Sequence, residues 1–352
     1  MRDEVDQAAW REALLADLRH EAALTPGHQL ASIFFGGGTP SLMPPATVAA
    51  LIDAATGYWP VADNLEITLE ANPSSVEANK FADLAKAGVN RLSLGLQSLD
   101  DEALRFLGRA HGVAEGLAAL DVAQAQFDRV TFDLIYALPD QDLATWEAML
   151  RRALGFGTTH LSLYQLTIEP GTRFATMAQQ GGLVPKDADE AADFFELTQA
   201  ITSDAGLPMY EVSNHAAKGQ ESRHNLVYWR YQDYAGIGPG AHGRRGGMAT
   251  MRHKKPENWM AALARNEHGC QEESMLSPRD RAAERLLMGL RLVEGLAIPD
   301  WQAAYIDWDR VDRLVIQGLM TRQGNHIAAS ANGMLLLNAL IDACFKGDDD
   351  GR

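Results

Sequence analysis

Cysteine is scarce in this sequence, with two among 352 residues. Cys270 and Cys344 lie far apart and show no Cys-x-x-Cys spacing, so we expect two unpaired thiols. Basic residues are also few, since lysine and arginine number 31 against 47 aspartates and glutamates, a formal net charge of −16. This acidic excess argues against a nucleic acid or an anionic membrane surface as the main partner.

Long apolar runs and targeting signals are missing as well. No apolar stretch of the sequence approaches the length of a membrane span. The charged residues 1–6 are unlike a secretory signal. The composition, 46% hydrophobic and 22% charged, fits an ordinary globular enzyme, and we expect a cytoplasmic location.

Strand-like and helical segments alternate along the first two hundred residues. The predicted strands are rich in β-branched and large apolar residues and cover 32–35, 65–70, 91–97, 129–137, 160–168 and 208–213. The predicted helices cover 4–24, 44–58, 75–87, 99–107, 112–126, 142–155 and 187–205. This alternation indicates an α/β fold with parallel strands, and the lack of a Gly-x-Gly-x-x-Gly fingerprint favours a partial (β/α) TIM-type barrel over a doubly wound sheet. Because a helix comes first, either the barrel is open at that edge or its first strand precedes residue 1.

We predict three parts along the chain: the partial barrel at 1–213, a connector at 214–273 and a C-terminal module at 274–352. The connector is rich in glycine, histidine and aromatic residues, which indicates a functional loop or linking segment. In the C-terminal module, helical patterns surround Gly324-Asn325, a hairpin turn signal, and this order suggests a winged-helix-like module. Because the chain is acidic, we interpret that module as structural or as a partner surface.

Polar residues stand at the ends of successive predicted strands, where (β/α) barrels place their chemistry. Three glycines, 36–38, follow the first strand, and such a loop lets the backbone approach a polar ligand. Glu70 and Gln97 end the next two strands, and Asp133 interrupts the fourth. Each has an ordinary structural explanation, such as helix capping, turn closure or pairing with Arg109. Together they would suit an amino-acid-like, ribose-bearing ligand.

Five motifs occur in order between roughly residues 30 and 140, and they are Gly36-Gly37-Gly38-Thr39-Pro40-Ser41, Glu70-Ala71-Asn72-Pro73, Gly95-Leu96-Gln97-Ser98, Gly108-Arg109-Ala110-His111 and Asp133-Leu134-Ile135-Tyr136-Ala137-Leu138-Pro139. They resemble the radical S-adenosylmethionine (SAM) enzymes of the oxygen-independent coproporphyrinogen III oxidase group. Within that group, His224-Asn225-x-x-Tyr228-Trp229 is similar to the haem-binding signature of the HemW-type haem chaperones, which are taken to bind and deliver haem.

The resemblance implies two ligand sites and no assigned catalytic residue. The residues that would bind SAM are Gly37, Gly38, Thr39, Glu70, Gln97, Arg109 and Asp133. His224 would be the ligand of the haem iron, with Tyr228 and Trp229 packed on the macrocycle. The structural alternative for His224 is an ordinary loop histidine in a buried aromatic corner.

One departure from the family is large. The family carries a Cys-x-x-x-Cys-x-x-Cys loop after its first strand, and the three thiolates hold a [4Fe–4S] cluster whose open iron takes SAM. This chain lacks that motif, and its two cysteines cannot replace it, so the resemblance implies no radical chemistry from the chain as given. Either the start is truncated, which would remove the first strand and the loop together, or this is a cluster-free paralogue. We favour truncation because a missing first strand would expose an edge, and we expect the cluster only in a longer form.

The leading hypothesis from the sequence is therefore a haem chaperone on a radical SAM scaffold. Its partners would be haem and a haem-accepting protein, with a peripheral contact to a membrane protein as one route of delivery, and no nucleic acid. Two alternatives remain: an oxygen-independent coproporphyrinogen III oxidase of porphyrin biosynthesis, and a degenerate SAM-binding scaffold without haem.

Overall fold

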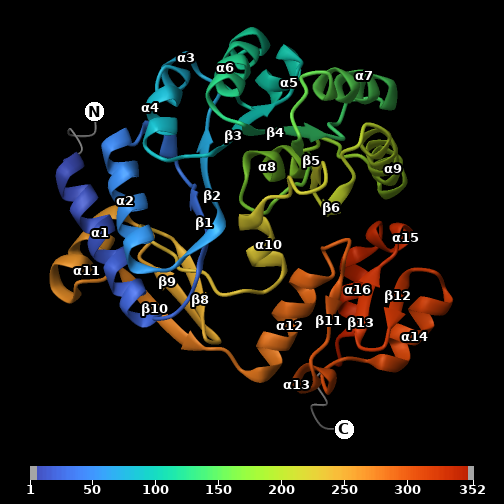
Figure 1. The fold of residues 1–352 in the computed structure, drawn as a ribbon. Helices are drawn as coiled ribbons and strands as arrows, with labels where there is room; N and C mark the ends of the chain where they lie inside the picture. The colour runs from blue at the N-terminus through green and yellow to red at the C-terminus, as the bar shows by residue number, and fades with distance from the viewer. Residues whose placement is uncertain (1–5, 348–352) are drawn as a thin grey trace. The chain divides into compact units, whose positions relative to one another are not determined.

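A seven-stranded sheet organises the first two thirds of the chain (Figure 1). The structure is a computed structural model, and it describes residues 6–347. The strands are β1 Leu30–Phe35, β2 Val61–Ala71, β3 Arg91–Gln97, β4 Arg129–Tyr136, β5 His160–Gln165, β6 Met209–Glu211 and β7 Asn214–Ala216. Their order in the sheet is β1-β2-β3-β4-β5-β7-β6. The predicted α/β fold with a partial barrel is confirmed, although the short strand β7 was not predicted.

The central strands run in parallel, as the alternation of strands and helices predicted. The end of β2 pairs in parallel with β3, β3 with β4, and β4 with β5. By contrast, β7 pairs antiparallel with both β5 and β6. The carboxyl ends of β2, β3, β4 and β5 therefore lie at the same edge of the sheet, which is where ligand sites form in such folds.

Nine α-helices precede β6 among the described residues: α1 Gln7–Leu24, α2 Pro45–Tyr58, α3 Ser75–Ala78, α4 Phe81–Lys86, α5 Asp101–Phe106, α6 Val113–Gln126, α7 Leu143–Leu154, α8 Arg173–Gln179 and α9 Ala188–Asp204. Asp100, Asp142 and Asp187 begin α5, α7 and α9 by accepting backbone N–H groups. The predicted helix 75–87 is interrupted at Asn79 and Lys80, and α8 was not predicted.

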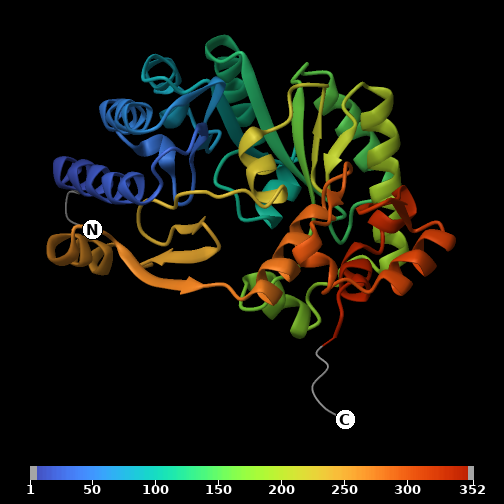
Figure 2. The same cartoon turned by 60° about the horizontal axis from the view of Figure 1, so that its bottom comes forward.

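Residues 214–273, which we predicted to be a connector, contain regular structure (Figure 2). After β7 come α10 Arg223–Trp229, β8 His242–Arg245, β9 Met248–Arg252, α11 Pro256–Asn266 and β10 Cys270–Met275. The last three strands form an antiparallel sheet in the order β10-β9-β8. Helix α11 packs on α1, where the rings of Trp10 and Trp259 lie 5.5 Å apart.

The C-terminal module contains helices and a small antiparallel sheet, as predicted. Its elements are α12 Pro278–Gly289, β11 Leu296–Ala297, α13 Asp300–Ala303, α14 Trp308–Ile316, β12 Met320–Gln323, β13 His326–Ala329, α15 Ala331–Met334 and α16 Leu337–Cys344. Strand β13 lies between β11 and β12, and Gly324, at the turn before β13, has a φ of 63°. The last two helices, α15 and α16, are separated by Leu335 and Leu336.

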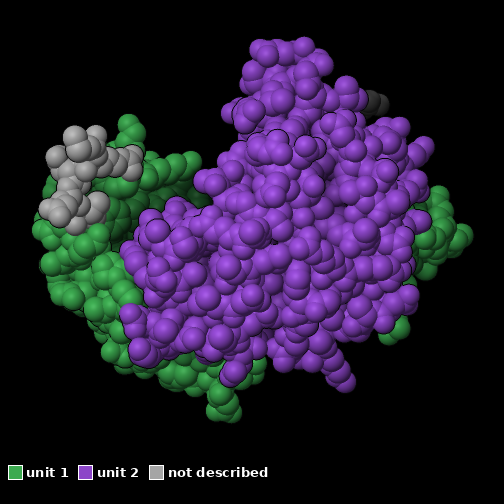
Figure 3. Space-filling model, turned by 90° about the horizontal axis from the view of Figure 1, so that it is seen from above, with its two compact units in different colours: residues 1–34, 43–67, 222–352 green, residues 35–42, 68–221 purple. Residues whose placement is uncertain are grey.

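The chain divides into two compact units (Figure 3). Unit 2 comprises residues 35–42 and 68–221, and unit 1 comprises residues 1–34, 43–67 and 222–352. All the residues predicted to bind SAM lie in unit 2, and all those predicted to bind haem lie in unit 1. Within residues 6–347, no helix combines the length and the apolar character needed to cross a membrane.

Candidate ligand sites

The glycine loop after β1 borders open space, and a hydrogen bond joins it to the end of β2. Gly37 and Gly38 have φ angles of 74° and 56°, a left-handed conformation that favours glycine. A Cβ built on either residue would meet no atom within 4 Å, so the loop borders unfilled space. The backbone N–H of Gly37 donates to Oε2 of Glu70 at 3.2 Å, which joins the loop to the end of β2.

A second carboxylate, Glu77 on α3, holds the segments on either side of this contact. It is buried, and it accepts from the hydroxyl of Ser41, which follows the glycine loop. It also accepts from the backbone N–H of Asn72 at 2.7 Å and from the Asn72 side chain at 3.1 Å. The sequence analysis did not single out Glu77, whose role is to fix the glycine loop and the Glu70-Ala71-Asn72-Pro73 segment in place.

Asp133 on β4 lies at the centre of the predicted SAM residues. Ser162 is its neighbour on β5, and the side chains of Ser162 and Gln97 and the charges of Glu70 and Arg109 all act on its carboxylate. Burial, reinforced by the negative charge of Glu70, raises the pKa of Asp133 to about 7, although Ser162, Arg109 and Gln97 act in the opposite direction. The structure therefore brings Glu70, Gln97, Arg109 and Asp133 together, and it adds Ser162, which was not predicted.

Gln97 reaches this cluster because β3 ends irregularly. The pairing of β3 with β4 shifts register between Leu94 and Gln97, and Gln97 has a φ of 69°, which is unusual for a residue other than glycine. A Cβ on Gly95 would lie 3.1 Å from Nε2 of Gln97, so glycine at this position leaves room for the amide. The Gly95-Leu96-Gln97 motif thus serves to turn one buried amide toward Asp133.

The cluster combines negative charge with groups that stay neutral. Burial raises the pKa of Glu70, and the N–H of Gly37 partly offsets that effect. Burial, together with the charge of Asp133, also raises the pKa of Tyr164, so its phenol remains protonated at neutral pH. Arg109 is exposed and Tyr164 is partly exposed, so the cluster is accessible to a solute. Two carboxylates and an open glycine backbone can accept hydrogen bonds from an ammonium group or ribose hydroxyls, which fits the polar parts of SAM.

The cysteines of the chain do not fit a [4Fe–4S] cluster. Cys270 lies in β10 and Cys344 in α16, both are free and buried, and both belong to unit 1. The sulfur of Cys344 lies 3.4 Å from that of Met320, inside the C-terminal module. A cluster of this kind needs three or four thiolates at one place, and these two residues cannot supply them.

His224 is held at the start of α10 with its imidazole between two aromatic rings. Glu66 on β2 accepts from the backbone N–H of His224 at 3.1 Å and from the hydroxyl of Ser222 at 3.3 Å. The imidazole stacks on Phe34 of β1 with ring centroids 4.0 Å apart and an angle of 12°, and Tyr228 meets it edge-on at 4.8 Å. Neither ring nitrogen bonds to another residue in the described part of the chain. Burial lowers the pKa of His224 to about 4, so the ring is neutral at pH 7.

Trp229 lies apart from His224 and Tyr228. A separation of five residues turns the two side chains of positions 224 and 229 to different sides of a helix. Trp229 instead lines a groove of about 380 Å³ with residues of α12, β11 and β13, including Arg285, Gly289 and His326. The guanidinium of Arg291 lies 5.9 Å from its ring, and its Nε1 is buried without a hydrogen-bond partner among the described residues. The structure thus places Tyr228, but not Trp229, beside the predicted iron ligand.

Comparison with known proteins gives matches over nearly the whole chain. The model of the radical SAM superfamily matches residues 8–153, and that of the HemN C-terminal domain matches residues 276–336. The chain is 39% identical to "Radical S-adenosyl methionine domain-containing protein 1, mitochondrial" of Bos taurus, over 96% of this chain and 80% of that protein. It is 35% identical to "Heme chaperone HemW" of Escherichia coli (strain K12), over 97% of this chain and 91% of that protein.

A solved structure has the same fold. It is that of coproporphyrinogen III oxidase (HemN) from Escherichia coli, described as a radical SAM enzyme. The TM-score is 0.78, and the match covers 97% of this chain and 84% of that one at 20% sequence identity. At this identity the likeness establishes the fold alone.

Proposed function

We propose that this chain, which belongs to the HemW-type group of the radical SAM superfamily, binds haem and delivers it to an acceptor protein. The observation that carries the proposal is the environment of His224. Its imidazole is neutral at pH 7, makes no hydrogen bond within the described residues, and is held between Phe34 and Tyr228. A neutral imidazole with a free lone pair is the form that binds haem iron, and flat aromatic rings suit contact with a porphyrin.

The anchoring of α10 supports the same proposal. Glu66 binds the backbone at the first turn of this helix, and Ser222 caps it by accepting from Asn225 at 3.3 Å. These contacts fix where the helix begins, and they involve the backbone of His224 and not its ring nitrogens. Delivery requires that the ligand can be released, and a single iron ligand on a seven-residue helix is suited to exchange with a ligand of the acceptor protein.

We propose further that SAM binds at the cluster around Asp133. When bound, SAM supplies a sulfonium cation and an amino-acid group. Glu70 and Asp133 would balance the positive charge, Gln97 and Ser162 would orient Asp133, and the open backbone at Gly37 would face the ligand. Because the cysteines of this chain do not fit a [4Fe–4S] cluster, the proposal includes no radical step.

Equilibrium titration with haem tests the chaperone proposal. We expect the Soret band of added haem to shift on binding, and the His224→Ala variant to bind haem at least about tenfold more weakly, which corresponds to about 1.4 kcal/mol. His28→Ala is the matched control, because His28 is also in unit 1 but is exposed and faces Asp233 at 3.7 Å. Unchanged affinity in His224→Ala would remove this residue from the site. Binding of SAM without any binding of haem would favour a SAM-binding scaffold instead.

A further inference from the structure

Five side chains of the kinds that bind metals gather where α1 meets the β8–β10 sheet, and none of them belongs to either proposed site. They are His20 and Glu21 on α1, and His268, Cys270 and Glu273 in and just before β10. One ligand atom each from His20, Glu21 and Glu273 lies within 4.8 Å of the other two. All five residues belong to unit 1.

The thiol of Cys270 and the ring of His268 flank this triad. The sulfur of Cys270 lies 3.7 Å from Oε1 of Glu273, and the imidazole of His268 stacks on that of His20 with centroids 4.3 Å apart. His268 also accepts the backbone N–H of Cys270 through Nδ1 at 3.3 Å, which fixes its orientation. Cys270 is 8% exposed, so water has little access to the thiol.

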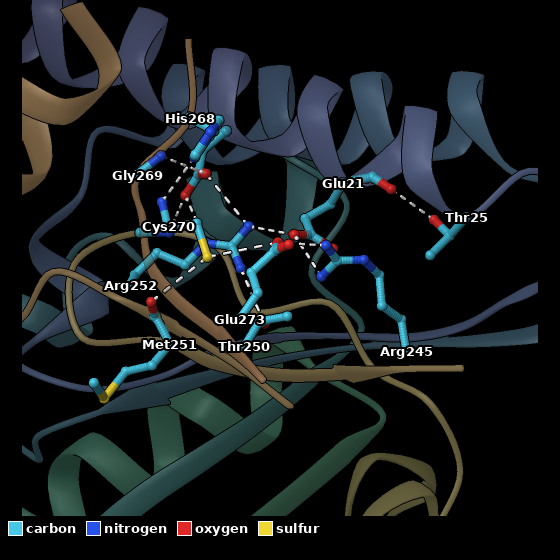
Figure 4. Close-up of polar contacts among 12 residues, drawn as sticks. Glu21, Thr25, Arg245, Thr250, Met251, Arg252, His268, Gly269, Cys270 and Glu273 are labelled. Atoms are coloured by element: carbon cyan, nitrogen blue, oxygen red, sulfur yellow. Dashed lines mark hydrogen bonds and ion pairs between the residues drawn. The ribbon is translucent and has the colours of Figure 1, made fainter. Parts of the chain in front are cut away.

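Two arginines contact the carboxylates but leave one oxygen of each free. Arg252 donates to Oε1 of Glu21 at 2.6 Å, and Arg245 reaches the same oxygen at 3.5 Å. Arg245 also donates to Oε1 of Glu273 (Figure 4). Within residues 6–347, no donor reaches Oε2 of Glu21 or Oε2 of Glu273. Each carboxylate can therefore keep its arginine and still offer an oxygen to a cation.

The net charge around the cluster is also compatible with a bound divalent cation. Asp17, Glu21 and Glu273 carry three negative charges against the two positive charges of Arg245 and Arg252. Deprotonation of the Cys270 thiol would add a fourth negative charge and bring the sum to −2. A divalent ion would neutralise that sum, so the arginines do not forbid its binding.

We propose that His20, Glu21, Cys270 and Glu273 bind one divalent transition-metal ion of the zinc class. A mixed nitrogen, sulfur and oxygen ligand set is typical of tetrahedral Zn²⁺. With the usual metal–ligand lengths, the edge of such a tetrahedron is about 3.5 Å. The sulfur of Cys270 lies 3.7 Å from Oε1 of Glu273, which belongs to the same carboxylate as the free Oε2. The ligand atoms of His20, Glu21 and Glu273 lie within 4.8 Å of one another, a separation that side-chain rotation can shorten to this edge. His268 positions His20 by stacking.

Titration of the full chain with Co²⁺, an optical probe for zinc sites, tests the proposal. We expect one equivalent to bind and to give a thiolate-to-cobalt charge-transfer band, which Zn²⁺ then displaces. Cys270→Ser should abolish the band, and His20→Gln and Glu273→Gln should each weaken binding at least about tenfold. Cys344→Ser is the matched control, because Cys344 is the other buried free thiol, and it should retain the band.

Two results would contradict the proposed metal site. If the wild-type chain binds no Co²⁺ at micromolar concentration, or if the band persists in Cys270→Ser, the proposal is wrong. The variants His20→Gln and Glu273→Gln change partly or largely exposed side chains, so a folding defect of Cys270→Ser would not prevent the test. The result is independent of the haem site, which shares no residue with this cluster.

Discussion

Asp17 is the residue of unit 1 whose replacement should destabilise the protein most clearly. It is fully buried on α1 and accepts from five donors. Its Oδ2 accepts from Gly238 N at 3.1 Å, Arg252 Nε at 3.3 Å and Trp259 Nε1 at 3.2 Å. Its Oδ1 accepts from Arg252 Nη2 at 3.4 Å and Gly269 N at 3.1 Å. One carboxylate therefore joins α1 to four separate segments.

The size of the effect follows from these contacts. Asp17→Asn keeps the shape but replaces one accepting oxygen with an NH₂ group, which would face donors. If the amide oxygen of the new asparagine takes the place of Oδ2, the NH₂ group takes the place of Oδ1. The backbone N–H of Gly269 then has no acceptor, at a cost of about 1–3 kcal/mol. It also removes the charge opposite the fully buried Arg252, which then keeps Glu21 as its partner. Breaking a buried ion pair from one side typically costs about 3–5 kcal/mol, and we expect Asp17→Asn to fall in that range.

Urea denaturation gives the free energy of unfolding, and hydrogen exchange of residues 7–24 reports whether α1 is the part that opens. Glu12→Gln is the control, because the side chain of Glu12 on the same helix is 70% exposed, and its effect should stay within about 0.5 kcal/mol. In the double variant Asp17→Asn/Arg252→Met, the loss should be smaller than the sum of the two single losses, because each single loss already includes the broken Asp17–Arg252 pair. A loss below about 1 kcal/mol for Asp17→Asn would refute this account of the network.

Two further predictions concern unit 2. Gly37→Ala should lower the free energy of unfolding by about 1–2 kcal/mol because of the positive φ at this position, and it should weaken SAM binding in calorimetric titration. Gly57→Ala is its control, since Gly57 lies in α2 with free space around it, and alanine there should be neutral or stabilising; equal losses in both variants would contradict the prediction. Because the pKa of Asp133 is raised, the folded state holds a proton that the unfolded state releases. This group therefore lowers the free energy of unfolding as the pH rises from about 4 to about 7. Asp133→Asn should therefore stabilise the chain at pH 8 and change little at pH 4, as measured by urea denaturation at both values, and a larger gain at pH 4 would show that the sign is wrong.

The residues around Asp133 could be predicted from the sequence because parallel strands share one direction. Once 65–70, 91–97 and 129–137 are recognised as successive strands, Glu70, Gln97 and Asp133 must approach the same edge of the sheet. Their supports could not be predicted in this way. Glu77 acts through contacts with Ser41 and Asn72. Ser162 acts because the strand register places it opposite Asp133. Both interactions depend on how separate segments of the chain meet.

The network of Asp17 shows a different limit. The one local signal is that Asp17 and Glu21 lie four residues apart on the same side of α1 as the buried Ala13, where apolar residues would be expected. That signal indicates that the carboxylates are paired, but it does not identify the partners, which follow more than 200 residues later. Gly269 is part of the same arrangement, since a Cβ there would overlap the indole of Trp259.

The segment that resembles a haem-binding signature is interpreted differently once α10 is known to be a helix. Predicted as part of a connector, the segment gave no reason to separate Tyr228 from Trp229. On a helix, Tyr228 is four residues after His224 and shares its face, whereas Trp229 is five residues after it and does not. Tyr228 is therefore suited to act on the imidazole and on a ligand bound to it, while Trp229 packs toward Arg291 and the C-terminal module. Replacing Tyr228 should change haem affinity directly, whereas replacing Trp229 should act first on the packing of α10 against α12.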